Sequence, residues 1–264
     1  MKKAIICAIG ALALMLATNT PNDFKSWYFV PASTTGEAPG WDASFDLENY
    51  NTHYLGDTSR KEIYLTFDEG YENGHTEVIL DVLRDKNVPA AFFVTKPYIK
   101  DNPDLVRRMV DEGHVVGNHT VRHKSSPSLS CEEIATELAG VAEFFKEITG
   151  KEIPKFFRPP MGEYSQRVLE TVANEGYATI FWSFAYEDWK VDKQPGVTAA
   201  HRKVTNGLHN GAILLLHAVS SSNAGAMGDI IDTAREMGYE FRCLHQLTAP
   251  AWPPTLGLGE VLGD

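Results

Sequence analysis

Side chains that can transfer protons or bind metals recur at the ends of short apolar runs in this 264-residue chain. The groups are Asp68-Glu69, His119 with His123, Arg158, Asp188 and His217. Carboxylates and imidazoles exchange protons near neutral pH, and both bind divalent metals. Each group alone has a plainer interpretation: an acidic pair is usually a solvated turn, a histidine after an apolar run is usually a core residue, and an arginine beside prolines can close a loop.

The spacing of His119 and His123 adds to this pattern. Residues four apart lie on one side of a helix, so a single helical turn could bring both imidazoles together. Such a pair is more often structural than metal-binding when it stands alone. The five groups together are more specific than any one of them, because each follows a predicted strand and all would meet at one rim of the fold.

The elements that position these groups alternate regularly from Glu62 onward. We expect strands at Ile63–Phe67, Ala90–Thr95, Val115–His119, Lys155–Arg158, Ala178–Phe184, Ala212–His217 and Tyr239–Leu244. Helical spacing separates them at Thr76–Leu83, Pro103–Glu112, Cys131–Thr149, Gln166–Glu175, Thr198–Leu208 and Ala224–Met237. Seven strands separated by six helices indicate an α/β fold with a parallel sheet. Because a closed barrel needs eight strands, we expect a distorted, incomplete (β/α) barrel, with a doubly wound open sheet as the alternative.

The N-terminus resembles an export signal. Lys2 and Lys3 precede an apolar run from Ala4 to Ala17, which is too short to span a bilayer comfortably. We therefore expect a signal peptide at 1–20, an extended segment at 21–60, one catalytic domain at 61–248 and an extended tail at 249–264. The protein would act outside the cytoplasmic membrane, or remain attached to it if the signal is not cleaved.

Composition narrows the function classes. The net charge of −11 becomes −13 without Lys2 and Lys3, which disfavours nucleic acid and anionic membrane surfaces as partners. Phosphate-binding glycine loops and a G-x-S-x-G motif are absent from the sequence, so nucleotide enzymes and serine hydrolases have no support. Cys131 and Cys243 are interpreted as buried thiols, with pairing as the alternative. We expect a monomer.

In order along the chain, the polar groups resemble the five motifs of the polysaccharide deacetylases, a carbohydrate esterase family with a NodB homology domain. The matching stretches are Thr66-Phe67-Asp68-Glu69, His119 to His123, Arg158 to Gly162, Asp188-Trp189 and Leu215 to His217. Tyr54-Leu55-Gly56, Asp68 to Gly74, Phe181-Trp182-Ser183 and Glu187 to Lys190 resemble one branch, the N-acetylmuramic acid deacetylases that make muramic δ-lactam in the spore cortex. The resemblance implies a metal-dependent de-N-acetylase whose partner is a peptidoglycan glycan strand.

The resemblance also implies roles for individual residues. Asp68 would be the general base, held by Arg158, and His217 would be the general acid, oriented by Asp188. The remaining roles fall to the substrate-binding residues Met161, Trp189, Leu215 and Tyr71. The backbone N–H of Met161 would stabilise the oxyanion, while Trp189 and Leu215 would shape the acetyl pocket.

The metal site departs from the family pattern at one position. His119, His123 and an acidic residue would hold a divalent metal, most simply zinc, with manganese or cobalt as alternatives. The acidic residue is aspartate in the family but is Glu69 here. Either the backbone adjusts, or Glu69 binds through a water, or it turns away and leaves two histidines. The rival functions are a deacetylase of another polysaccharide, such as chitin oligomers, and a non-catalytic glycan-binding protein.

Overall fold

The computed structural model describes residues 20–30 and 45–247, in which a curved parallel sheet forms the centre. The strands are β1 (Lys25–Ser26), β2 (Thr52–His53), β3 (Glu62–Glu69), β4 (Ala90–Val94), β5 (Val115–Asn118), β6 (Phe156–Phe157), β7 (Glu163–Tyr164), β8 (Ala178–Ile180), β9 (Phe184–Ala185), β10 (Ala212–His217) and β11 (Glu240–Phe241). The main order is β2-β8-β6-β5-β4-β3-β10-β9, and β11 pairs with the start of β3. The expected incomplete, distorted barrel is confirmed.

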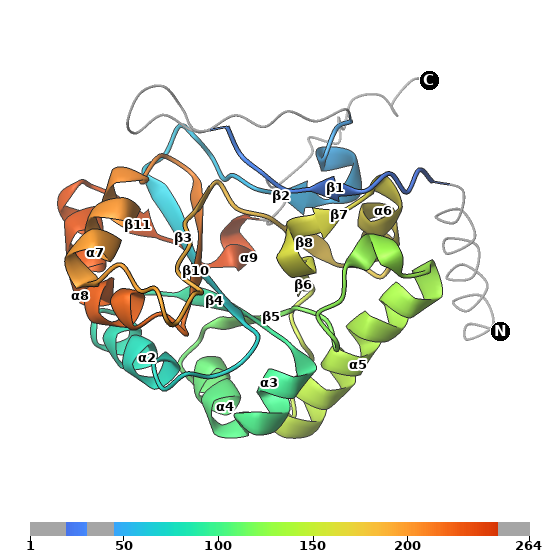
Figure 1. Cartoon of the computed structure of the whole chain (residues 1–264), viewed down its shortest axis with the longest axis horizontal. Coiled ribbons are helices and arrows are strands. Elements are labelled where there is room, and N and C mark those ends of the chain that lie inside the picture. Colours follow the sequence, from blue (N-terminus) through green and yellow to red (C-terminus); the bar gives the residue numbers. More distant parts are fainter. Residues whose placement is uncertain (1–19, 31–44, 248–264) are drawn as a thin grey trace, which may run out of the picture.

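Most of the helices cover the outside of the sheet, and the last one packs against side chains on its inner face. The helices are α2 (Thr76–Asp85), α3 (Lys96–Asp101), α4 (Pro103–Asp111), α5 (Cys131–Thr149), α6 (Gln166–Asn174), α7 (Val197–Asn206), α8 (Ser221–Glu236) and α9 (Leu244–Leu247), with 3₁₀ turns η1 (Glu48–Tyr50), η2 (Ser126–Ser128) and η3 (Pro160–Gly162). Figure 1 shows them as an arc running from α7 and α8 through α2, α4 and α3 to α5. No helix among the described residues has the length and apolar composition of a membrane span.

Local sequence explains where several elements begin and end. Helix α5 has the bounds expected from sequence, because Ser130 and Glu133 form a complete capping box and Gly150 ends the helix with a left-handed φ of 71°. Helix α3 was not expected, and it begins where the hydroxyl of Thr95 accepts the N–H of Tyr98. The expected strand 178–184 is divided into β8 and β9.

Alternation along β3 decides which side chains reach the barrel interior. Ile63, Leu65 and Phe67 pack into the core between the sheet and the helices. The residues between them point the other way, toward the inside of the curved sheet, since successive side chains of a strand alternate. This period places Asp68 inside and Glu69 on the helix side.

The chain before β3 crosses the sheet ends. Strand β1 pairs with β7, and the ring of Trp27 stacks on Phe181 with centroids 4.3 Å apart. The backbone N–H of Trp27 donates to Gly162 (2.8 Å) and its indole N–H donates to Trp182 (3.0 Å). The predicted signal, apart from Thr20, and the predicted tail lie outside the described residues. Among the described residues, Cys131 and Cys243 are free thiols, Cys131 buried as expected and Cys243 only half-buried.

A close backbone approach gives a test of this arrangement. Gly211 has φ of +75°, and a Cβ there would lie 2.6 Å from the carbonyl oxygen of Gly56. We predict that Gly211→Ala lowers the free energy of unfolding by about 2 to 4 kcal/mol, from left-handed strain plus steric overlap. Gly150→Ala is the control, with similar φ and open space, and should cost only about 1 kcal/mol. Equal losses in urea titrations would contradict the packing.

Candidate active site

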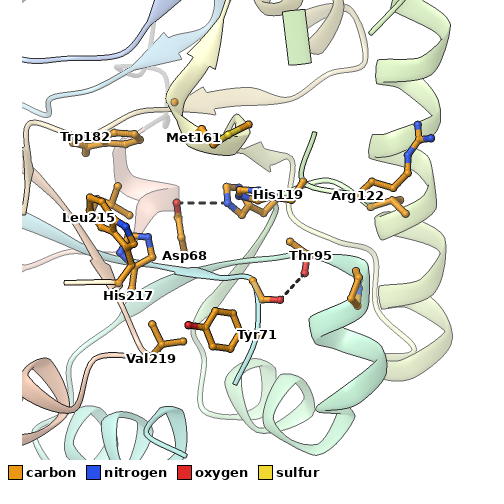
Figure 2. A pocket seen from close by; sticks show the side chains of 16 residues that line it. Asp68, Tyr71, Thr95, His119, Arg122, Met161, Trp182, Leu215, His217 and Val219 are labelled. Atoms are coloured by element: carbon orange, nitrogen blue, oxygen red, sulfur yellow. Dashed lines mark hydrogen bonds and ion pairs between the residues drawn. The ribbon is translucent and has the colours of Figure 1, made fainter. Parts of the chain in front are cut away.

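A cavity of about 680 Å³ opens where the strands end, and it has the size of a small-ligand site. Eight residues assigned a role from sequence line it: Asp68, Tyr71, His119, His123, Met161, Trp189, Leu215 and His217. Figure 2 shows Asp68 and His119 at its centre, Leu215 and His217 on one side, and Met161 and Trp182 above. Of the other predicted residues, Arg158 and Asp188 lie behind the wall, while Glu69 lies on the far side of the sheet.

Arg158 is fully buried, and its side chain contacts residues at the ends of several strands. Its guanidinium donates to Asp68 (2.8 Å) and to the hydroxyl of Thr66 (2.9 Å), both on β3. It also donates to the carbonyl oxygens of Ile180 (2.9 Å) and Phe181 (3.3 Å), and it lies 4.2 Å above the ring centre of Phe93. These contacts give a buried cation the hydrogen bonds and the counter-charge that it requires.

The ion pair sets the charge of Asp68. Burial alone would raise the pKa of this carboxyl, but the charge of Arg158, with contributions from His119 and His217, holds the pKa below its usual value. Asp68 is therefore ionised at neutral pH. A carboxylate that lines the cavity and is held in one orientation can accept a proton from a bound water.

The two predicted ligand histidines come together in a loop, not in the helical turn that their spacing suggested. Thr120 and His123 have left-handed φ values of 71° and 51°. The Asn118 side chain accepts the N–H of Thr120, and the Thr120 hydroxyl accepts the N–H of His123, each at 3.0 Å. These local hydrogen bonds offset the backbone strain. The imidazole centroids of His119 and His123 are 4.8 Å apart.

Both imidazoles have the form that metal binding requires. Nδ1 of His119 donates to the carbonyl of Arg158 (2.9 Å), which leaves Nε2 facing Asp68, whose Oδ2 is 3.6 Å away. Burial lowers the pKa of His119 to about 4 and also lowers that of His123, so both rings are neutral at pH 7. Within 20–30 and 45–247, no three His, Cys, Asp or Glu side chains are grouped to share one ion. His119 and His123 are thus the two side chains that could bind a metal here, as neutral imidazoles and without a third protein ligand among the described residues.

Glu69 shows the third of the three arrangements considered above, because its side chain turns away from the histidines. It pairs with Val94 in regular β3–β4 register, so the strand alternation continues through it. Its carboxyl is completely buried, and neither oxygen has a hydrogen-bond partner in the described part of the chain. Burial, followed by the charges of Glu72 and Asp68, raises its pKa well above 4.5. Burial thus favours the neutral form of Glu69, on the helix side of β3.

His217 has the opposite electrostatic environment to His119. Its Nδ1 donates to Asp188 (2.7 Å), and its backbone N–H donates to the other oxygen of the same carboxylate (2.8 Å). Burial would lower the pKa of His217, but the hydrogen bond and charge of Asp188 raise it above 6.5. Asp188 therefore favours the protonated imidazole, which is the form that a general acid needs.

Apolar and aromatic side chains form the walls. Leu215 is buried, while Met161, Trp189 and Tyr71 are about half exposed at the rim. Met161 has a left-handed φ of 58°, unusual for a side chain other than glycine. Sequence reasoning assigned no site role to the remaining lining residues: Gly70, Thr95, Pro97, Val121, Arg122, Gly162, Trp182 and Val219. Several of them stand in stretches that carry the resemblance: Trp182 and Gly70 in those of the δ-lactam branch, and Val121, Arg122 and Gly162 within the family motifs.

Comparisons with known proteins find relatives that match most of this chain. The polysaccharide deacetylase family model matches residues 55–180. Bacillus subtilis peptidoglycan-N-acetylmuramic acid deacetylase PdaA is 40% identical over 250 residues, covering 92% of this chain and 95% of its own. Its structure, a family 4 carbohydrate esterase, superposes with a TM-score of 0.82 at 42% identity, covering 86% of this chain and 98% of its own. A Bacillus anthracis family 4 carbohydrate esterase gives 0.71 at 41% identity, covering 86% and 97%.

The buried carboxyl of Glu69 predicts a pH-dependent stability. Because its folded-state pKa lies above 4.5, the folded state loses stability as pH rises from 4.5 toward that pKa. The slope from this group is at most about 1.4 kcal/mol per pH unit. We predict that Glu69→Gln gains stability relative to the wild type as pH rises from about 5 to 8, measured by urea unfolding. The exposed control Glu240→Gln should track the wild type, and parallel curves for Glu69→Gln would contradict the prediction.

Proposed function

The chain belongs to the polysaccharide deacetylase family, and we propose that it removes the N-acetyl group from N-acetylmuramic acid in peptidoglycan. The observation that carries the proposal is the pair of opposed charge states in one cavity. Asp68 is ionised beside Arg158, and Asp188 favours the protonated form of His217. Amide hydrolysis needs this combination of a base for water and an acid for the leaving amine.

The proposed reaction begins with water in the cavity. Asp68 accepts a proton from this water while the water oxygen bonds to the acetyl carbonyl carbon. This addition forms a tetrahedral oxyanion. The backbone N–H of Met161 donates a hydrogen bond to that oxyanion. His217 then gives its Nε2 proton to the nitrogen as the C–N bond breaks. The products are acetate and the free amine of the sugar.

His119 and His123 would hold a divalent metal in this family member, with zinc expected and manganese or cobalt as alternatives. When bound, the metal lowers the pKa of coordinated water and polarises the carbonyl. The cavity walls position the substrate: Leu215 and Trp189 surround the acetyl methyl group, and Tyr71 packs against the sugar at the rim.

The preferred substrate in this proposal is N-acetylmuramic acid whose stem peptide has been removed. Deacetylation then places a free amine on the same sugar as a free lactyl carboxyl, and these are the two groups of the δ-lactam amide. The similarity to a peptidoglycan-N-acetylmuramic acid deacetylase over 92% of the chain supports this choice. We place the enzyme outside the cytoplasmic membrane as a monomer, exported by residues 1–20, because its polymer substrate lies there.

The substrate assignment predicts selectivity within one glycan strand. Peptide-free peptidoglycan strands should release acetate and yield deacetylated muramic acid, while N-acetylglucosamine in the same strand stays acetylated. Mass spectrometry of digested products identifies the sugar. The control Asp68→Asn should lower the rate by about 10²- to 10⁴-fold, because it removes the base. Equal or faster release from chitin oligomers would favour the alternative substrate, and no release from any acetylated glycan would favour a non-catalytic binding protein.

The geometry also predicts which residues matter for metal affinity. His119→Ala should lower zinc affinity by at least about 10-fold, because it removes one of two facing imidazoles. Glu69→Gln should leave affinity within about twofold, because its side chain lies behind the strand. Calorimetric titration of zinc into metal-free protein measures both, and His245→Ala is the matched histidine control outside the cavity. Comparable losses in Glu69→Gln and His119→Ala would show that Glu69 is a ligand.

A further inference from the structure

Asn223 is a buried polar residue that does not line the cavity. It lies in the first turn of α8, where the hydroxyl of Ser220 accepts its backbone N–H (3.1 Å) and caps the helix. The side-chain amide is therefore not needed for capping. The side-chain amide instead contacts Asp188 and the backbone of His217, the proposed general acid.

The amide joins three groups that come from two parts of the chain. Its Nδ2 donates to Asp188 Oδ2 (2.6 Å) and to the carbonyl oxygen of His217 (3.4 Å). Its Oδ1 accepts the hydroxyl of Tyr186. A carboxylate and a carbonyl can only accept hydrogen bonds, so these contacts fix the amide orientation. Asn223 thus connects the segment between β9 and α7, which carries Tyr186 and Asp188, to the end of β10.

This connection acts on the carboxylate that orients the acid. Asp188 is fully buried, and its Oδ1 receives Nδ1 of His217. Its Oδ2 receives the His217 backbone N–H and the Asn223 amide. Two donors on Oδ2 restrict rotation of the carboxylate about its χ2 bond, which is otherwise a broad torsion. The plane of the carboxylate then sets the direction of the imidazole.

We infer that Asn223 is a positioning residue for the proposed deacetylation: it fixes the Asp188 carboxylate so that Nε2 of His217 faces the substrate. The inference rests on the proposed function, but its geometry is that of Asp188 and His217 alone. The other charged or titratable groups facing His217 are Asp68 on β3, Arg158 after β6 and His123 after β5. All three remain in the variants below.

Kinetics separate positioning from substrate binding. Asn223→Leu should lower kcat by about 10- to 100-fold through misalignment of the acid. KM should change less than about twofold, since Asn223 does not reach the cavity. Ser222→Ala is the matched control, because it is buried in the same helical turn and loses a hydrogen bond to Gly196 (2.9 Å) in the same segment, without contacting Asp188. Its kcat should stay within about twofold of the wild type.

A double-mutant cycle tests whether Asn223 acts through Asp188. In an Asp188→Asn background, Asn223→Leu should have little further effect on kcat, because the orienting carboxylate is already absent. An equal loss in both backgrounds would overturn the inference.

A substrate-free measurement keeps this test distinct from that of the proposed function. NMR titration of the His217 imidazole in the metal-free full chain should show its midpoint fall by about one pH unit in Asn223→Leu, because the aligned Asp188 bond stabilises the imidazolium. Tyr186→Phe should give a smaller shift in the same direction, and it decides the matter if Asn223→Leu fails to fold. Unchanged midpoints overturn the inference even if the wild type is active. A lower His217 midpoint in Asn223→Leu, with no acetate released from any glycan by the wild type, would support the positioning role and contradict the proposed deacetylase activity.

Discussion

The buried ion pair of Arg158 and Asp68 is the constraint on which the site depends. Asp68 lies on β3 and Arg158 follows β6, with β4 and β5 between them in the sheet. In a flat sheet those strands would be about 14 Å apart, three spacings of about 4.8 Å. The 2.8 Å contact therefore requires strong curvature, and the curvature brings the other strand ends together. Removing either partner would leave a buried charge without its counter-charge.

The cavity around this ion pair is lined by groups in different charge states. Arg158 keeps a carboxylate ionised, burial keeps His119 neutral, and Asp188 favours the protonated form of His217. Burial acts on all three groups, and the charged partners of each group decide the outcome. Burial outweighs the charge of Asp68 at His119, whereas Arg158 with the two histidines outweighs burial at Asp68, and Asp188 with Asp68 outweighs it at His217. In the proposed mechanism, the roles of base, metal ligand and acid follow from these environments as well as from the residue types.

Much of this arrangement could be predicted from sequence because it depends on local pattern. Strand ends carry the polar groups, and alternation along β3 separates Asp68 from Glu69. The sequence left three arrangements open for Glu69, because the choice among them depends on whether β3 stays paired as far as that residue, as it does. The helical explanation of the histidine pair failed because Asn118 and Thr120 bond the loop locally. Asn223 carried no sequence signal, since its role depends on contacts across 35 residues.

The segment around Trp27 has a consequence for the order of folding. It is made early, yet its indole N–H bonds to the carbonyl of Trp182, 155 residues later, and its ring stacks on Phe181. These contacts close a loop of 155 residues, which costs chain entropy before they form. Until the loop closes, the ring of Trp27 lacks its stacking partner. The hydrogen bond from the backbone N–H of Trp27 to Gly162 therefore forms late in folding. The cavity wall at Met161, next to Gly162, should be among the last parts to form.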